Sequence, residues 1–163
     1  MYKNILLPTD GLGKCKSGTC HGILLARDLG AKITAVYVTR HLTAAEILKV
    51  YHEETPWGAS DSKKVQEAIA EAERSHKEEA EKALEVAEKM CIEIGVPCET
   101  VYLEEESPVD GILCAARDKG CDLIFLSTHG NPGIMGMLIG TLATKIMSYS
   151  KYPILIHYCE GPG

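Results

Sequence analysis

The residues with the clearest potential for chemistry lie between Asp122 and Pro153. The apolar run Leu123-Ile124-Phe125-Leu126 is short and bounded, like a buried strand of a parallel sheet. A polar loop with glycines follows at 127–133, and Gly140-Thr141 then opens a helical pattern. Backbone N–H groups in a glycine loop and at a helix N-terminus are free to bind an anion. The stretch therefore predicts a phosphate-binding loop that belongs to a nucleotide site.

The composition indicates a globular domain with an acidic balance. The chain has 163 residues, of which 25% are charged and 45% hydrophobic, and its formal net charge is −6. A chain with this net charge has no basic stripe that could neutralise the phosphates of a nucleic acid, so we expect no nucleic-acid partner. No apolar run approaches the length of a membrane span, and Met1-Tyr2-Lys3 leads directly into a strand. We therefore expect no signal peptide, no membrane association and a cytoplasmic location.

The chain contains seven cysteines, an odd number. Cys15 and Cys20 form the only close pair, and their spacing differs from the CxxC pattern of zinc and redox sites. We expect reduced thiols, with an intramolecular disulfide as the open alternative. Four others fall in or beside apolar patterns, where a cysteine acts as a small hydrophobic residue: Cys91, Cys98, Cys114 and Cys121.

Strand and helix patterns alternate along the first part of the chain. Ile5-Leu6-Leu7 predicts a strand, and the residues from Pro8 to Gly11 predict a turn. A helix is expected at 20–29, followed by a strand rich in β-branched residues at 33–38. Asp10 follows the first strand, where open α/β sheets collect ligand contacts, although a role in the turn or as a helix cap would also explain it.

The same alternation continues to the end of the chain. The longest helical pattern runs from Lys63 to Ile94, with a narrow apolar stripe and a charged face. Ser107-Pro108 indicates the start of a further helix. Strands are predicted at 98–103, 123–126 and 154–157, and the last helix is marked by Leu142, Ile146 and Tyr149. The order predicts one doubly wound, five-stranded parallel α/β sheet with helices on both faces.

The least regular segment spans residues 40–62. Thr43-Ala44-Ala45-Glu46 resembles a capping box that opens a short helix, and 52–58 indicates a loop that carries Trp57. We expect a partly helical insert within a single domain of residues 1–163. Adjacent His52, Glu53 and Glu54 on a loop are weak evidence for a metal site, so we expect no metal held by side chains.

The chain resembles the universal stress protein family over essentially its full length. The opening ILLPTDG resembles the family's first strand and its aspartate-bearing turn, and KYPILI resembles its final strand. Nucleotide-binding members carry the loop G-x2-G-x9-G-[S/T]. Gly130, the nine-residue gap and Gly140-Thr141 match this loop, whereas Ser127 replaces its first glycine. The resemblance implies the nucleotide-binding subgroup and the strand order 3-2-1-4-5.

The resemblance also implies an adenine nucleotide as ligand: ATP, ADP or AMP, with Mg²⁺ or Mn²⁺ carried by the phosphates. Asp10, after Pro8 and Thr9, would lie near the ribose or adenine. The backbone of Val38 would lie against the adenine, and Leu126 and Ser127 would lie beside the ribose. The loop and last helix would contact the phosphates through His129, Gly130, Gly140, Thr141 and Leu142.

Ser127 leaves two outcomes open. If its position requires a left-handed backbone or has no room for a Cβ, serine would hinder the nucleotide. If the position has ordinary β geometry, serine would fit. The sequence therefore permits either an ATP-binding regulatory module of the stress response or a related dimer that binds no nucleotide and acts through protein contacts.

The sequence gives little support for an enzyme. It contains no G-K-[ST] motif, no evident arginine finger and no Ser-His-Asp arrangement, so we expect at most a slow ATPase. The resemblance implies a homodimer that pairs through the strand at 154–157. An apolar terminal strand on an exposed edge of the sheet is physically suited to this pairing. The protein partner of such a module is unknown.

Overall fold

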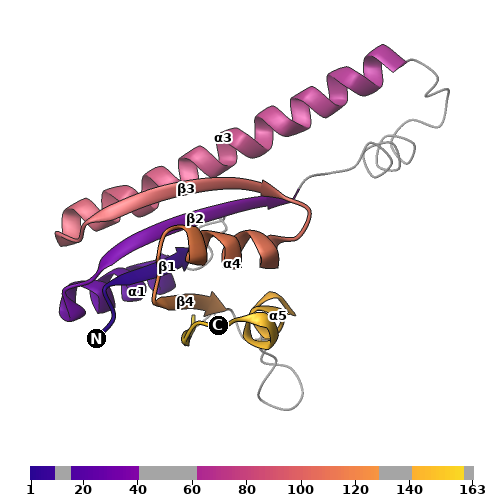
Figure 1. Cartoon of the computed structure of the whole chain (residues 1–163). Helices are drawn as coiled ribbons and strands as arrows, with labels where there is room; N and C mark the ends of the chain where they lie inside the picture. Colours follow the sequence, from indigo (N-terminus) through magenta and orange to yellow (C-terminus); the bar gives the residue numbers. More distant parts are fainter. Residues whose placement is uncertain (10–15, 41–61, 129–140, 160–163) are drawn as a thin grey trace.

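The computed structural model describes residues 1–9, 16–40, 62–128 and 141–159, which form a five-stranded sheet flanked by helices (Figure 1). All strand pairs are parallel, and the order is β3-β2-β1-β4-β5. This confirms the predicted fold class and the strand order 3-2-1-4-5. The elements are β1 (Asn4–Pro8), α1 (Lys16–Leu29), β2 (Lys32–Arg40), α3 (Ser62–Ile94), β3 (Cys98–Glu105), α4 (Pro108–Asp118), β4 (Leu123–Thr128), α5 (Thr141–Tyr149) and β5 (Ile154–Tyr158).

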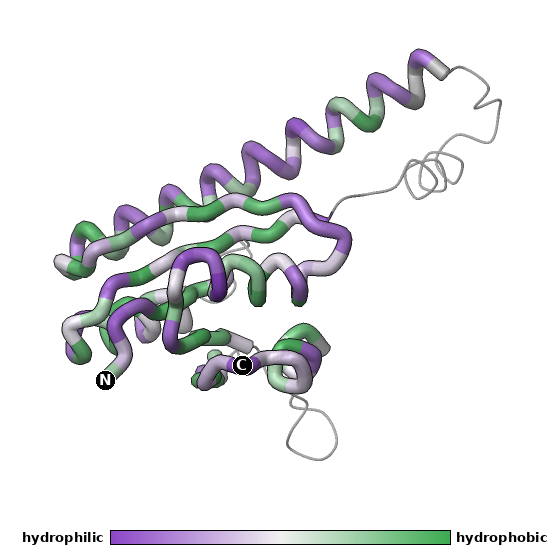
Figure 2. Tube along the Cα trace, viewed as in Figure 1, coloured by the Kyte–Doolittle hydropathy of each residue, from purple (hydrophilic) through white to green (hydrophobic). Residues whose placement is uncertain are grey.

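Helices cover both faces of the sheet. Side chains alternate between the two faces along each strand, so one strand packs against helices on both sides. Ile5 and Leu7 of β1 pack in one cluster with α1 and α3, whereas Leu6 packs in a second cluster with α4 and α5. The middle parts of β1, β2 and β4 are accordingly apolar (Figure 2). Since a strand buried on both faces needs a continuous apolar run, β1 and β4 have the pattern that the sequence showed.

Helix α3 is longer than the part of the sheet that it covers. Its buried residues begin at Ala80, and its amino-terminal part extends beyond the end of β3 (Figure 1). The charged face includes an ion pair between Glu85 and Lys89, with an N–O distance of 2.6 Å. The buried side chains near its carboxyl end are mostly small, which lets the helix lie close to the sheet: Ala80, Ala83, Leu84, Ala87 and Cys91.

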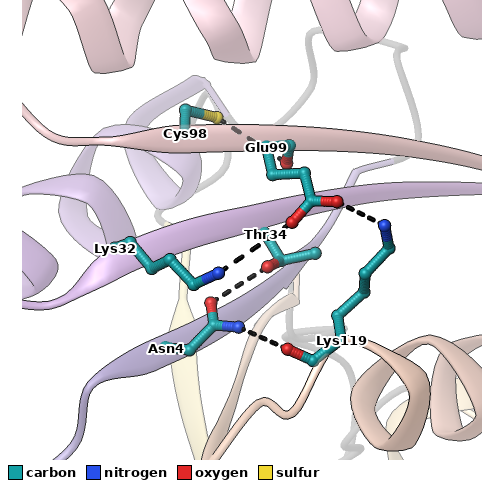
Figure 3. Close-up of polar contacts among 6 residues, drawn as sticks. All are labelled: Asn4, Lys32, Thr34, Cys98, Glu99 and Lys119. Carbon is teal, nitrogen blue, oxygen red and sulfur yellow. Dashed lines mark hydrogen bonds and ion pairs between the residues drawn. The ribbon is translucent and has the colours of Figure 1, made fainter.

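A polar network joins the amino ends of the central strands (Figure 3). Asn4, only 4% exposed, accepts a hydrogen bond from the Thr34 hydroxyl at 2.9 Å. Its amide nitrogen donates to the Lys119 carbonyl at 2.9 Å. The Asp122 carboxylate accepts from the backbone N–H groups of Lys3 and Asn4 at 2.8 and 3.0 Å. Because these buried polar groups are paired, the amino ends of β1, β2 and β4 are held in a fixed register.

Helix α4 packs unusually close to β2. Ser107 caps the helix and Pro108 begins it, as predicted. One turn on, a Cβ placed on Gly111 would lie 2.6 Å from Val38 Cγ1 and 3.2 Å from Glu105 Cγ. Only glycine leaves the room that this contact requires. The Gly111 backbone thus sets how far α4 stands from the carboxyl end of β2.

Three sequence predictions need correction. Helix α1 begins at Lys16, earlier than the predicted residue 20, and β4 continues through Ser127 and Thr128, which were assigned to the loop. In α5 only Ile146 of the predicted apolar trio is buried, because Ala143 rather than Leu142 or Tyr149 turns toward the sheet. The short helix near Thr43 lies outside the described residues.

The thiols also depart from the expectation of uniformly reduced cysteines. Cys159 is disulfide-bonded. The free cysteines among the described residues are Cys20, Cys91, Cys98, Cys114 and Cys121, and of these Cys91 and Cys121 are buried. These two positions agree with the prediction that cysteines in apolar patterns act as small core residues.

We predict that Gly111→Ala destabilises the wild-type chain by about 1–2 kcal/mol, because overpacking outweighs the better helix propensity of alanine. In a Val38→Ala background the clashing methyl groups are absent, so the same substitution should be neutral or stabilising. Chemical denaturation of the four proteins in this double-mutant cycle measures the coupling. Equal effects in both backgrounds would show that α4 does not rest on Val38.

Candidate functional site

The two central strands, β1 and β4, part toward their carboxyl ends. They pair only at Ile5–Leu123 and Leu6–Ile124, although both strands are fully described beyond these residues. On either side the pairing continues, to Pro8–Val36 between β1 and β2 and to Thr128–Tyr158 between β4 and β5. The strand order reverses at this point, and open α/β sheets bind ligands in the crevice where it does so. The carboxyl edge between β1 and β4 is the candidate site.

On the β1 side of this edge lie Pro8 and Thr9, both half-buried. The Thr9 N–H donates to the Val36 carbonyl at 2.9 Å, so the chain follows β2 for one residue after β1 ends. Val38 lies two residues further along β2 and packs against α4. The structure thus brings three of the predicted site residues to the same edge of the sheet.

On the β4 side of this edge lie Leu126 and Ser127. Leu126 is 5% exposed and packs in the same cluster as Ala143 and Ile146 of α5, so the last helix lies against the end of β4. Ser127 is half-buried and pairs with His157 of β5. Because Ser127 belongs to a parallel ladder, its backbone has ordinary strand geometry. Ser127 therefore meets the condition of ordinary β geometry, one of the two that the sequence left open.

Beside Ser127, three aromatic rings stack on the α1 face of the sheet. The His157 ring lies 4.4 Å from that of His21 and 6.0 Å from that of Phe125, measured between centroids. Burial and the neighbouring His21 imidazole lower the pKa of His157. The neutral imidazole is therefore favoured, and it can accept or donate a hydrogen bond at the carboxyl edge.

Sequence reasoning missed this histidine pair. His157 stands at the end of the final strand and His21 lies on a helix more than a hundred residues earlier, so no spacing rule connects them. The signal that was available is the alternation of β5: His157 occupies a position that faces α1, in register with Ser127.

Helix α5 begins at Thr141, as the predicted Gly140-Thr141 start requires. Leu142 follows in the first turn and its side chain is 44% exposed. Any contact from Leu142 to a phosphate would therefore use its backbone N–H, which like others in the first turn has no partner within the helix. The remaining predicted site residues, Asp10, His129, Gly130 and Gly140, lie outside the described residues, as does the side chain of Thr141.

Within residues 1–9, 16–40, 62–128 and 141–159, no group of three or more His, Cys, Asp or Glu side chains is arranged to hold a metal ion. Among the described helices, none combines the length and apolar character needed to cross a membrane.

A doubly wound parallel sheet whose strand order reverses between β1 and β4 is an open α/β architecture, the class to which this fold belongs. The chain belongs to the universal stress protein family, whose model matches residues 1–157. It is 30% identical over 156 residues to universal stress protein MJ0531 of Methanocaldococcus jannaschii, an alignment that covers 96% of this chain and 82% of that protein.

Solved structures share the fold. The structure of the hypothetical protein MJ0577 superimposes with a TM-score of 0.72 and 22% identity, covering 99% of both chains. A universal stress protein of Arabidopsis thaliana with AMP bound gives a TM-score of 0.62 and 16% identity, covering 97% of this chain and 92% of that one. One of Archaeoglobus fulgidus in complex with dAMP gives 0.61 and 14%, covering 95% and 97%.

We predict that His157 makes stability depend on pH. The pKa of His157 in the folded chain lies below its usual value of 6.5, so the unfolded state takes up a proton first as the pH falls. The contribution of His157 to the free energy of unfolding is fully present above pH 6.5. It is lost as the pH falls through the pKa of His157 in the folded chain. His157→Phe keeps a ring against His21 but removes the titration, so its stability should decline less on acidification.

Urea unfolding of wild type and His157→Phe from about pH 8 to about pH 5 measures the difference. His76→Phe, which replaces a histidine of α3, is the matched control and should follow the wild-type profile. Parallel profiles for wild type and His157→Phe would contradict the prediction.

Proposed function

We propose that this chain binds an adenine nucleotide in the crevice between the carboxyl ends of β1 and β4 and acts as a regulatory module of the stress response. The observation that carries the proposal is the parting of β1 and β4 at the reversal of strand order. Two proteins of the same fold, described above, contain AMP and dAMP. The loop match at Gly130 and Gly140-Thr141 supports the same ligand class.

In this proposal the adenosine lies across the edge of the sheet. Thr9 and the backbone of Val38 flank the adenine, with Asp10 near the ribose, while Leu126 and Ser127 contact the ribose from β4. Ser127 supports this placement because a strand position tolerates a small Cβ, and its hydroxyl adds a donor and an acceptor.

The phosphates would extend toward the start of α5. Helix N-termini attract anions through free N–H groups and the helix dipole. We expect ATP with Mg²⁺ or Mn²⁺, the metal being held by phosphate oxygens and water rather than by a cluster of side chains. Because the sequence has no Walker lysine, hydrolysis should be slow or absent, and nucleotide occupancy itself would be the signal.

Isothermal titration of ATP with Mg²⁺, and separately of AMP, tests the site. We expect micromolar binding to the wild type. Gly140→Asp places a carboxylate and a Cβ at the phosphate loop and should weaken ATP binding about tenfold or more. Ser148→Asp is the matched control: it adds the same charge to an exposed position at the far end of α5 and should bind like the wild type.

These titrations distinguish the nucleotide-binding module from the dimer that acts through protein contacts. If the wild type gives no heat with either nucleotide and carries none after purification, the proposal of a nucleotide-binding module is wrong. The dimer that acts through protein contacts would then be the function that remains. If ATP binds equally to all three proteins, the nucleotide lies elsewhere than at this loop.

We also propose a homodimer that forms through β5. This strand pairs with β4 on one side, and no described strand pairs with its other edge. Edge strands with apolar side chains are templates for pairing with another chain. Five exposed large hydrophobic residues gather on α5 and β5: Leu142, Met147, Tyr149, Leu155 and Tyr158.

Sedimentation of the wild type should give twice the mass of the chain. Leu155→Lys puts a charge on the β5 edge and should shift the protein to monomer. Ile92→Lys changes an even more exposed hydrophobic residue, 71% against 36%, on α3 rather than at this edge, and should leave the dimer intact. A monomeric wild type, or a dimer unaffected by Leu155→Lys, would contradict pairing through β5.

A further inference from the structure

The start of α1 and the end of β5 lie close together at the carboxyl edge of the sheet. His21 is five residues after the first residue of α1, and its ring stacks on that of His157 at a centroid distance of 4.4 Å. A Cβ placed on Gly22 would lie 3.0 Å from Leu7 Cδ1 and from Phe125 Cδ1, so this part of the helix rests directly on β1 and β4. Two segments that are far apart in the sequence are therefore in contact here.

Cys159 is fixed at this place by the sheet. It follows β5 directly and is 6% exposed. Its N–H donates to the Thr128 carbonyl at 2.9 Å, so the pairing with β4 continues through it. Because side chains two residues apart in a strand point to the same face, Cys159 faces α1 as His157 does. It lies about 7 Å beyond His157 in the direction of the strand.

The start of α1 lies at a matching depth. In a crossover between parallel strands, the helix begins at the carboxyl edge of the sheet and runs back toward the amino edge. Lys16, the first residue of α1, precedes His21 by about 7.5 Å along the helix axis. From the stacked rings, Lys16 and Cys159 are thus displaced in the same direction by similar distances. The residue that precedes Lys16 in the sequence is Cys15.

The cysteine count points to the partner of Cys159. Cys159 is disulfide-bonded in a structure that contains a single chain, so its partner belongs to the same chain. The chain has seven cysteines, and the described ones other than Cys159 are free, including Cys20 on α1. Only Cys15 then remains as the partner of Cys159.

We propose that Cys15 and Cys159 form a reversible disulfide that fastens the start of α1 to the end of β5. Small disulfides such as oxidised glutathione close it, and dithiols open it. This cysteine pair is a site of thiol modification at the carboxyl edge of the sheet. It needs neither a nucleotide nor a second copy of the chain, so it is independent of the proposed function.

Closure proceeds by thiol–disulfide exchange. One cysteine thiolate attacks a sulfur of oxidised glutathione, forms a mixed disulfide and releases one glutathione thiolate. The other cysteine thiolate then attacks the protein sulfur of the mixed disulfide, so the S–S bond of the protein forms as the mixed S–S bond breaks. The two cysteine thiols lose two electrons and two protons, and one oxidised glutathione takes these up to become two glutathione thiols.

The bond should stabilise the folded chain. It closes a loop of almost the whole chain, which limits the conformations of the unfolded state. When it is open, the contacts that remain at this end of β5 include the hydrogen bond to Thr128 and the histidine stack. We therefore expect the urea midpoint of the oxidised protein to exceed that of the reduced protein by about 1 M or more.

Peptide mapping tests the pairing. The full chain is incubated with oxidised glutathione, its free thiols are blocked with N-ethylmaleimide in denaturant at mildly acidic pH, and it is cut with trypsin without reductant. Trypsin places Cys15 in peptide 15–16 and Cys20 in a different peptide. We expect peptide 152–163, which carries Cys159, to be joined to peptide 15–16 until dithiothreitol is added.

Two variants form a matched pair. Cys15→Ser should lose both the joined peptide and the difference between the urea midpoints of the oxidised and reduced protein. Cys20→Ser, which replaces the free thiol five residues further along the chain, should keep both.

The mapping of the wild type can by itself overturn the pairing. If Cys159 is found blocked by N-ethylmaleimide after oxidation, or if peptide 152–163 is joined to the peptide of Cys20 or to a second copy of itself, the bond to Cys15 does not exist. If the joined peptide persists after the native protein has been kept for hours in millimolar dithiothreitol, the bond is not the reversible one proposed.

Discussion

The structure depends on the way β1 is held between its neighbours. At its amino end, the Asp122 carboxylate bonds the backbone of Lys3 and Asn4, and the Asp122 N–H donates to the Asn4 carbonyl at 2.9 Å. Two residue pairs later the ladder between β1 and β4 ends. The strands are thus joined at one end and free to separate at the other. The candidate site lies at this unpaired end, within the sheet itself.

The fold was predictable because each strand and helix is consistent with its local pattern. Short apolar runs such as Leu123-Ile124-Phe125-Leu126 can be satisfied only by burial on two faces, and the alternation with helices then requires parallel pairing. The boundaries were less predictable. Ser127 and Thr128 read as loop because they are polar, but pairing with His157 and Tyr158 of β5 extends the strand through them.

The candidate site was predictable only in part, since it is assembled from residues that are distant in the chain. Pro8, Thr9, Val38, Leu126 and Ser127 were found from strand ends and the family pattern, and the structure brings them to one edge of the sheet. The histidine stack and the close approach of α4 at Gly111 depend on how helices pack on the sheet. The periodicity of α5 similarly allowed two apolar faces to be buried. In the structure the face with Ala143 and Ile146 packs in the core.

The two ends of the sheet have different chemistry. The carboxyl edge, beyond the end of the β1–β4 ladder, holds half-buried side chains such as Thr9 and Ser127. The amino edge is occupied by paired buried groups such as Asn4 and Thr34.

The length of α3 has a consequence for local unfolding. The helix has 33 residues, but from 62 to 79 no residue whose exposure is described is buried. That half is held by its own backbone hydrogen bonds and by exposed contacts such as Arg74–Glu71, whereas the half from Ala80 onward shares the stability of the core. Its amides should therefore exchange with solvent in a gradient along one continuous helix, through openings that leave the sheet intact.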